Sequence, residues 1–194
     1  MGNLAILAAT VWAKRTTPPK PLPAVDGTKH LHAVDAGLWR GSAPSRDGYA
    51  TLADRGVRVI VDLRAEEHRR VDEAFLAGLG VELVRIPIRD GQTPTTTQVE
   101  QFFVRSRTGD GIVFVHCGAG VGRTGTVVGA HLVRTGSATP GDALRRNLAV
   151  GPPSLEQIWY VARLGHGFTR PNIVVRALSR TLDAPRRLWS RLRS

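Results

Sequence analysis

The chain has 194 residues, of which 42% are hydrophobic and 22% are charged. These fractions are typical of one globular domain and exclude wholesale disorder, collagen and fibrous proteins. The single cysteine excludes an internal disulfide framework and fits a reducing compartment. The longest near-apolar stretch, residues 4–13, has about half the length that a membrane-crossing helix needs.

Positive charge is the outlier in this composition. Lysine and arginine total 27 against 16 aspartate and glutamate, which gives a formal net charge of +11. Such a balance attracts nucleic acids, anionic membranes or phosphorylated partners. A base-composition bias explains it equally well, because arginine, alanine and glycine are all abundant. After Phe168, seven arginines are opposed only by Asp183.

Three regions differ in composition. Residues 1–29 begin apolar and become rich in proline, which predicts a short docking helix or a frayed terminus and then an extended linker. A secretion signal is not expected, because Lys14 and Arg15 follow the apolar stretch instead of preceding it. Residues 30–167 form the predicted catalytic domain, and residues 168–194 form a basic amphipathic tail.

Hydrophobic periodicity changes repeatedly within the middle region. Apolar and β-branched runs predict strands at 57–61, 81–88 and 112–115, and helical spacing predicts helices at 66–79, 96–107, 123–135, 141–148 and 154–164. Strands that alternate with helices of this length are joined by crossovers in a parallel sheet. The sequence therefore predicts the α/β class, with a central, mainly parallel sheet flanked by helices.

The tail predicts a helix from residue 170 that Pro185 ends, before the apolar Leu188, Trp189 and Leu192. Its apolar positions share one side, opposite a side that carries Arg176, Arg180, Asp183 and Arg187. This pattern has two interpretations. The tail attaches to an anionic membrane surface, or it packs on the domain with its arginines in solvent.

The most informative stretch is residues 112–125, Ile-Val-Phe-Val-His-Cys-Gly-Ala-Gly-Val-Gly-Arg-Thr-Gly. A buried strand leads into a loop whose alternating glycines let successive N–H groups turn inward at the start of a helix. This arrangement predicts a site for an oxyanion of the size of phosphate. The spacing matches neither the phosphate loop of NTPases nor the dinucleotide fingerprint.

The Cys-x5-Arg spacing in this loop predicts nucleophilic chemistry at phosphorus. The only cysteine, Cys117, faces N–H dipoles and a helix N-terminus, surroundings that lower the pKa of a thiol. A thiolate beside bound phosphate is an attacking group. Arg123 can hold two phosphate oxygens, and Thr124 can donate a hydroxyl hydrogen bond to the sulfur.

Residues 116–125 resemble the signature loop of the cysteine-dependent protein-tyrosine and dual-specificity phosphatase superfamily. The resemblance extends over about residues 38–164, and residues 38–45 are similar to the strand and turn that open many atypical dual-specificity members. It implies that Cys117 forms a phosphocysteine intermediate and that His116 shapes the loop and helps to lower the thiol pKa. It also implies a phosphate-binding set: Gly118, Ala119, Gly120, Val121, Gly122 and Arg123.

The family order places a general acid upstream, on a loop after a strand. Asp90 fits, because it follows the strand predicted at 81–88 and could protonate the leaving oxygen. Asp62 is the remaining contender, whereas Asp110 precedes the strand of the nucleophile and falls at the opposite end of the sheet. Downstream, residues 154–160 resemble the glutamine loop of the tyrosine-specific branch, which implies that Gln157 positions the hydrolytic water.

The sequence therefore predicts a cytoplasmic phosphate-monoester hydrolase, a protein-tyrosine or dual-specificity phosphatase that uses no metal and no cofactor. The alternative is a phosphoinositide or inositol-phosphate phosphatase with the same mechanism at an anionic membrane. The expected partners are thus a phosphorylated protein or a phospholipid, with peripheral membrane contact through the tail and no nucleic acid. A non-catalytic phosphate-binding module is a third hypothesis, and a sulfur transferase is a remote fourth hypothesis.

Overall fold

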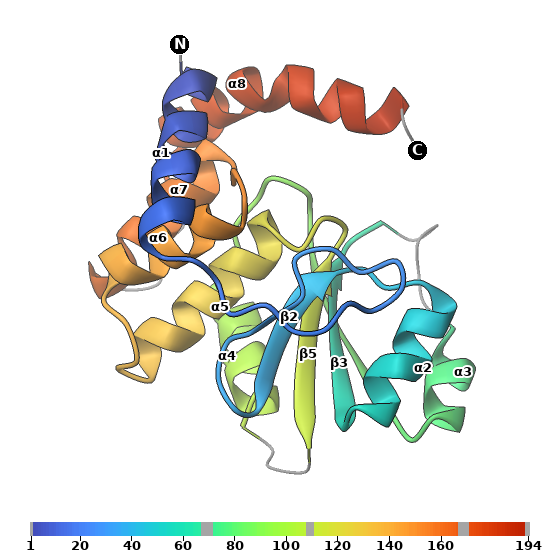
Figure 1. Cartoon of the computed structure of the whole chain (residues 1–194). Helices are drawn as coiled ribbons and strands as arrows, with labels where there is room; N and C mark the ends of the chain where they lie inside the picture. The colour runs from blue at the N-terminus through green and yellow to red at the C-terminus, as the bar shows by residue number, and fades with distance from the viewer. Residues whose placement is uncertain (1, 67–71, 108–110, 167–170, 193–194) are drawn as a thin grey trace.

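In a computed structural model, the chain folds around a five-stranded sheet whose order is β1-β2-β5-β3-β4 (Figure 1). The structure describes residues 2–66, 72–107, 111–166 and 171–192. The strands are β1 (His32–Ala33), β2 (Leu38–Ser42), β3 (Val57–Arg64), β4 (Glu82–Ile88) and β5 (Ile112–Cys117). β2, β5, β3 and β4 are parallel, and the short β1 is antiparallel to β2. This confirms the predicted α/β class.

β5 lies between β2 and β3, and this position determines where the sheet places its functional residues. Ser42 at the end of β2 pairs in register with Cys117, and Asp62 near the end of β3 pairs with His116. Because the strands are parallel, their carboxyl ends meet at one edge of the sheet. The loop that follows Cys117 therefore opens at that edge.

Helices cover both faces of the sheet. α2 (Arg46–Asp54) and α3 (Glu73–Gly78) lie on one face, and α4 (Thr96–Arg105) and α5 (Gly122–Arg134) lie on the other (Figure 1). Successive side chains of a strand point to opposite faces. Phe114 thus joins the core under α2 and α3, whereas Val113, Val115 and Cys117 join the core under α4 and α5.

α6 (Pro140–Val150) and α7 (Leu155–Ala162) extend the layer of α5, and a short 3-10 helix, η2 (Leu164–His166), follows α7. α1 (Gly2–Thr16) packs on α6 through Ala9 and Ala13, which contact Leu144, Leu148 and Ala149. Of the two possibilities for this terminus, a docking helix and a frayed end, the structure shows the docking helix.

Two expected helix boundaries are wrong. The helix predicted at 66–79 begins at Glu73, because the Asp72 carboxylate accepts a hydrogen bond from the Phe75 N–H and caps it there; residues 67–71 lie outside the described part.

α8 (Ile173–Leu192) also continues through Pro185 instead of ending there. A proline removes one backbone hydrogen bond from a helix, a loss that α8 accommodates. The side chains of residues 183–192 lie outside the description. No helix in the described ranges is both long and apolar enough to span a bilayer.

The packing of α4 gives a test of the core. Phe102 of α4 points into the core and is 1% exposed. Phe102→Ala should therefore lower the free energy of unfolding by about 3–5 kcal/mol. Val104 on the same helix is 63% exposed, and Val104→Ala should change it by less than about 0.5 kcal/mol. Urea unfolding measures both values, and equal losses would contradict this account of the core.

Candidate active site

The loop from Cys117 to Gly122, called the phosphate loop below, connects β5 to α5. The backbone N–H of Gly120 donates a hydrogen bond to Cys117 Sγ over 3.3 Å. Gly120 has a φ of +71°, and a side chain there would meet the backbone of Gly41 at 2.4 Å. The loop is thus seated directly on β2, and only glycine fits at its turning point.

Arg123, in the first turn of α5, is 5% exposed. Its Nη1 donates to both Glu66 oxygens over 2.9 and 3.1 Å and to the Ile88 carbonyl over 3.1 Å. Its Nη2 lies 3.4 Å from Asp90 Oδ1, and its buried Nε has no hydrogen-bond partner among the described residues. One side of the guanidinium is therefore fixed, and Nε and Nη2 remain to bind an anion.

The charges around Arg123 keep it protonated. Burial alone would lower its pKa, but the negative charges of Cys117, Asp90 and Glu66 raise it. Burial would likewise raise the pKa of Glu66, but the hydrogen bonds and charge of Arg123 outweigh burial and lower it. Glu66 is not among the predicted site residues, and it falls in the helix predicted at 66–79. Only the fold brings it to Arg123, and its acidic character was the one signal in the sequence.

The two candidate acids have different surroundings. The Asp90 side chain is 60% exposed, on the loop after β4, and lies at Arg123 as a general acid must. Asp62 is 1% exposed, and its carboxylate accepts three hydrogen bonds from the Arg64 guanidinium. Both Asp62 oxygens are thus engaged inside the protein, and the geometry favours Asp90 as the general acid.

His116 points to the opposite face of β5 from Cys117. Its Nε2 lies 3.1 Å from the Tyr49 hydroxyl, and its Nδ1 lies 3.4 Å from the Cys117 carbonyl oxygen. Burial lowers the pKa of His116 to about 4, and the charges of Arg64 and Arg123 contribute. The ring is therefore neutral at neutral pH, so its influence on the loop comes from position and not from a positive charge.

Two other predicted roles have no matching hydrogen bond. The buried Thr124 hydroxyl has no partner within the described chain, so the expected bond to sulfur is not formed in this structure. Gln157 lies against Gly122, but its Oε1 accepts from the Ser154 N–H and its Nε2 donates to the Gln92 carbonyl. Oε1 thus serves the capping box of α7 and Nε2 ties α7 to the loop after β4, and the role of Gln157 with water stays a prediction.

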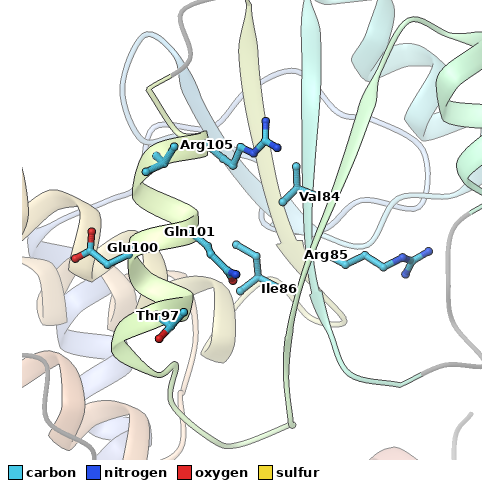
Figure 2. Close-up of a pocket in the computed structure, with 8 residues that line it drawn as sticks. Val84, Arg85, Ile86, Thr97, Glu100, Gln101 and Arg105 are labelled. Atoms are coloured by element: carbon cyan, nitrogen blue, oxygen red, sulfur yellow. The ribbon is translucent and has the colours of Figure 1, made fainter.

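A surface groove of about 430 Å³ lies elsewhere, between β4 and α4 (Figure 2). Its charged side chains are engaged in ion pairs: Arg85 with Glu73, Arg105 with Glu82, and Glu100 with Arg134. None of the residues that line it belongs to the phosphate loop.

Over the described ranges, no three histidine, cysteine, aspartate or glutamate side chains cluster in a way that could hold a metal ion.

A family model described as a DSP-PTPase phosphatase fused to NAD+ kinase matches residues 24–161. The chain belongs to this family. The match includes the phosphate loop, Asp90 and Glu66, and it leaves α8 outside.

Curated relatives and a solved structure agree with this assignment. Over 103 residues the chain is 28% identical to a probable chloroplastic NAD kinase 2 of Oryza sativa subsp. japonica, covering 49% of this chain and 10% of that protein. Over 117 residues it is 28% identical to the tyrosine-protein phosphatase CDC14 of Saccharomyces cerevisiae, covering 56% of this chain and 20% of that protein. The chain thus spans a tenth to a fifth of the length of these relatives.

The crystal structure of PTPMT1 in complex with PI(5)P superposes with a TM-score of 0.63 at 20% sequence identity. The superposition covers 72% of this chain and 97% of that one. It shows that the fold is that of dual-specificity-type phosphatases.

The seat of the phosphate loop predicts the outcome of two matched substitutions. Gly120→Ala should reduce vanadate binding and phosphatase turnover at least 100-fold, because its φ and the Gly41 backbone exclude a methyl group. Gly78→Ala, in α3, should change both by less than about twofold, since nothing lies within 4 Å of the added methyl group. Calorimetry and steady-state kinetics check this, and equal effects would contradict the proposed packing.

Proposed function

We propose that this chain hydrolyses phosphate monoesters on proteins through a phosphocysteine intermediate, as a protein-tyrosine or dual-specificity phosphatase. One observation carries the proposal. The Cys117 sulfur, the inward Gly120 N–H and the half-free guanidinium of Arg123 are assembled with the Asp90 carboxyl group at a single edge of the sheet. This set contains a nucleophile, an anion site and a proton donor.

In the first step the Cys117 thiolate attacks phosphorus, and the bond from phosphorus to the leaving oxygen breaks. Asp90, as a carboxylic acid, gives its proton to that oxygen. Arg123 binds two non-bridging oxygens through Nε and Nη2, while Glu66 and the Ile88 carbonyl hold Nη1. The charge that develops on the phosphoryl group thus meets a guanidinium whose orientation is already fixed.

In the second step water attacks phosphorus and the bond from phosphorus to sulfur breaks. Asp90, now a carboxylate, accepts the proton of the water, so that inorganic phosphate leaves and the thiolate is restored. Gln157 is proposed to direct this water, which requires its hydrogen bond with the Ser154 N–H or with the Gln92 carbonyl to open. The nucleophile and the charge stabilisation come from side chains and backbone, so we propose a reaction without a metal ion. The single cysteine fits a reducing compartment, so we propose that the reaction takes place in the cytoplasm.

Substitution of the nucleophile and of the acid tests this mechanism. Cys117→Ser should abolish phosphate release from para-nitrophenyl phosphate and from phosphopeptides, and EDTA should leave the parent unaffected. Asp90→Asn should slow phosphopeptide hydrolysis by about 10²–10⁴-fold, and should slow para-nitrophenyl phosphate hydrolysis less because its leaving group needs less protonation. Phosphate release and vanadate inhibition measure these effects. Parental turnover in Cys117→Ser would refute the mechanism, and vanadate binding without any turnover in the parent would identify a binding module.

A second candidate, a phosphoinositide phosphatase at an anionic membrane, is favoured by the outer surfaces of α1 and α8. α1 turns its small residues Thr10 and Ala13 to the protein and leaves its larger apolar side chains exposed: Leu4, Leu7, Val11 and Trp12. α8 is held by Ser179, whose Oγ accepts from the Glu156 N–H, and it exposes Ile173, Val174 and Leu178. Both helices therefore present apolar groups to solvent.

Charge indicates what these apolar groups would meet. Residues 2–16 and 171–182 contain Lys14, Arg15, Arg176 and Arg180 and no acidic residue. Apolar groups beside cations suit the surface of an anionic bilayer, whereas a second copy of the chain would bring like charges together. Figure 1 draws α8 at the end of the molecule at which the parallel strands finish, the end that carries the phosphate loop. PTPMT1 has been solved in complex with PI(5)P, which supports a lipid substrate for this chain.

Vesicle binding tests this second candidate. Replacing Leu4, Leu7 and Leu178 with Gln should reduce co-sedimentation with phosphatidylserine vesicles at least tenfold and reduce hydrolysis of PI(5)P in those vesicles. Turnover of para-nitrophenyl phosphate should not change. Val104→Gln removes an equally exposed apolar group on α4 and should have no effect. Binding equal to that of neutral phosphatidylcholine vesicles would contradict a membrane role and leave the protein phosphatase.

A further inference from the structure

β2 buries a second guanidinium behind the phosphate loop. Arg40 is 5% exposed, and it lies 80 residues before Gly120 in the chain. Its Nη2 donates to the Gly120 carbonyl over 2.8 Å, and it also lies 3.4 Å from the Val121 carbonyl and 3.4 Å from Asn147 Oδ1. Arg40 thus joins β2, the loop and α6.

A buried guanidinium needs compensation, and the partners of Arg40 supply little. The three hydrogen-bond acceptors described for it are neutral oxygens, and its Nε has none among the described residues. Burial lowers the pKa of Arg40 to about 10, and the negative charge of the Cys117 thiolate acts in the opposite direction. Arg40 is therefore charged at neutral pH, and the negative group whose charge acts on it is the Cys117 thiolate.

The hydrogen bonds of Arg40 also orient the backbone of the loop. In a trans peptide the carbonyl and the following N–H point in opposite directions. When Arg40 holds the Gly120 carbonyl toward β2, the Val121 N–H must point away from Arg40, into the loop. The weaker contact with the Val121 carbonyl acts in the same way on the Gly122 N–H. Two of the N–H groups that would bind phosphate are thus directed from behind.

We propose that Arg40 is a positioning residue for the reaction: it fixes the peptide units that follow Gly120 and Val121 with their N–H groups toward the phosphate, and places a positive charge behind the Cys117 sulfur. This inference rests on the proposed function. It adds a group that touches neither substrate nor leaving oxygen and that acts through the loop.

Arg40→Met and Arg40→Lys test this role against Arg58→Met. Arg58 is an exposed control whose Nη1 also donates to two backbone carbonyls, those of Ala53 and Val57, at the amino end of β3 far from the loop. Three readouts apply: vanadate affinity by calorimetry, kcat and KM on para-nitrophenyl phosphate, and the rate at which iodoacetamide alkylates Cys117 at pH 6. Cys117 is the only cysteine, so alkylation reports that sulfur alone.

We expect Arg40→Met to lower kcat by about 10²-fold, to weaken vanadate binding at least tenfold and to slow alkylation at least fivefold. Arg40→Lys keeps the charge but not the planar fork, so alkylation should stay within about twofold of the parent while vanadate binding still weakens. Arg58→Met should change none of the three. If Arg40→Met does not fold, the vanadate affinity of Arg40→Lys decides.

The inference is overturned if the folded Arg40 variants bind vanadate and react with iodoacetamide as the parent does and differ only in their urea midpoint. It is equally overturned if Arg58→Met shows the same losses. Vanadate binding and alkylation need no turnover. A parent that binds vanadate but releases no phosphate would therefore count against the proposed function and leave the test of Arg40 intact.

Discussion

A strongly charged anion must be bound at a point where β5 ends and α5 begins, and the local structure follows from that requirement. The phosphate loop can present its N–H groups inward only if its carbonyls find partners outside, and only if the chain can turn at Gly120 against the backbone of Gly41. The parallel sheet supplies both the backing strand and the helix N-terminus.

Around this loop, two buried guanidinium groups are held in place by hydrogen bonds. Arg123 is held through Nη1 by Glu66 and the Ile88 carbonyl, and its Nε faces no protein acceptor among the described residues. Arg40 is held through Nη2 by loop carbonyls. Such preorganised groups need little reorganisation when charge develops on the phosphoryl group. Electrostatic stabilisation of this kind is usually the largest contribution to catalysis. The same arrangement places Asp90 at the open side, where a leaving group would depart.

The helices at the two ends of the chain, α1 and α8, expose apolar side chains to solvent. α1 and α8 contact the domain through small or polar residues, Ala13 and Ser179, and keep larger apolar groups outside. Helices that stabilised the core alone would bury those groups.

The sequence by itself determined the α/β class, the buried strand β5 and the reactive pair, because hydrophobic runs and the Cys117-to-Arg123 spacing are local properties of a few consecutive residues. It also placed Asp90 after a strand. The boundaries predicted for the start of α3 and the end of the tail helix were wrong, because there a single cap or proline competes with the surrounding packing. The contacts of Glu66 and Arg40 arise only in the folded chain, although Arg40 lies within residues 38–45, which resemble a segment of atypical dual-specificity phosphatases. Strand order brought them to the loop across 57 and 80 residues of sequence, and no local pattern encodes a contact of that range.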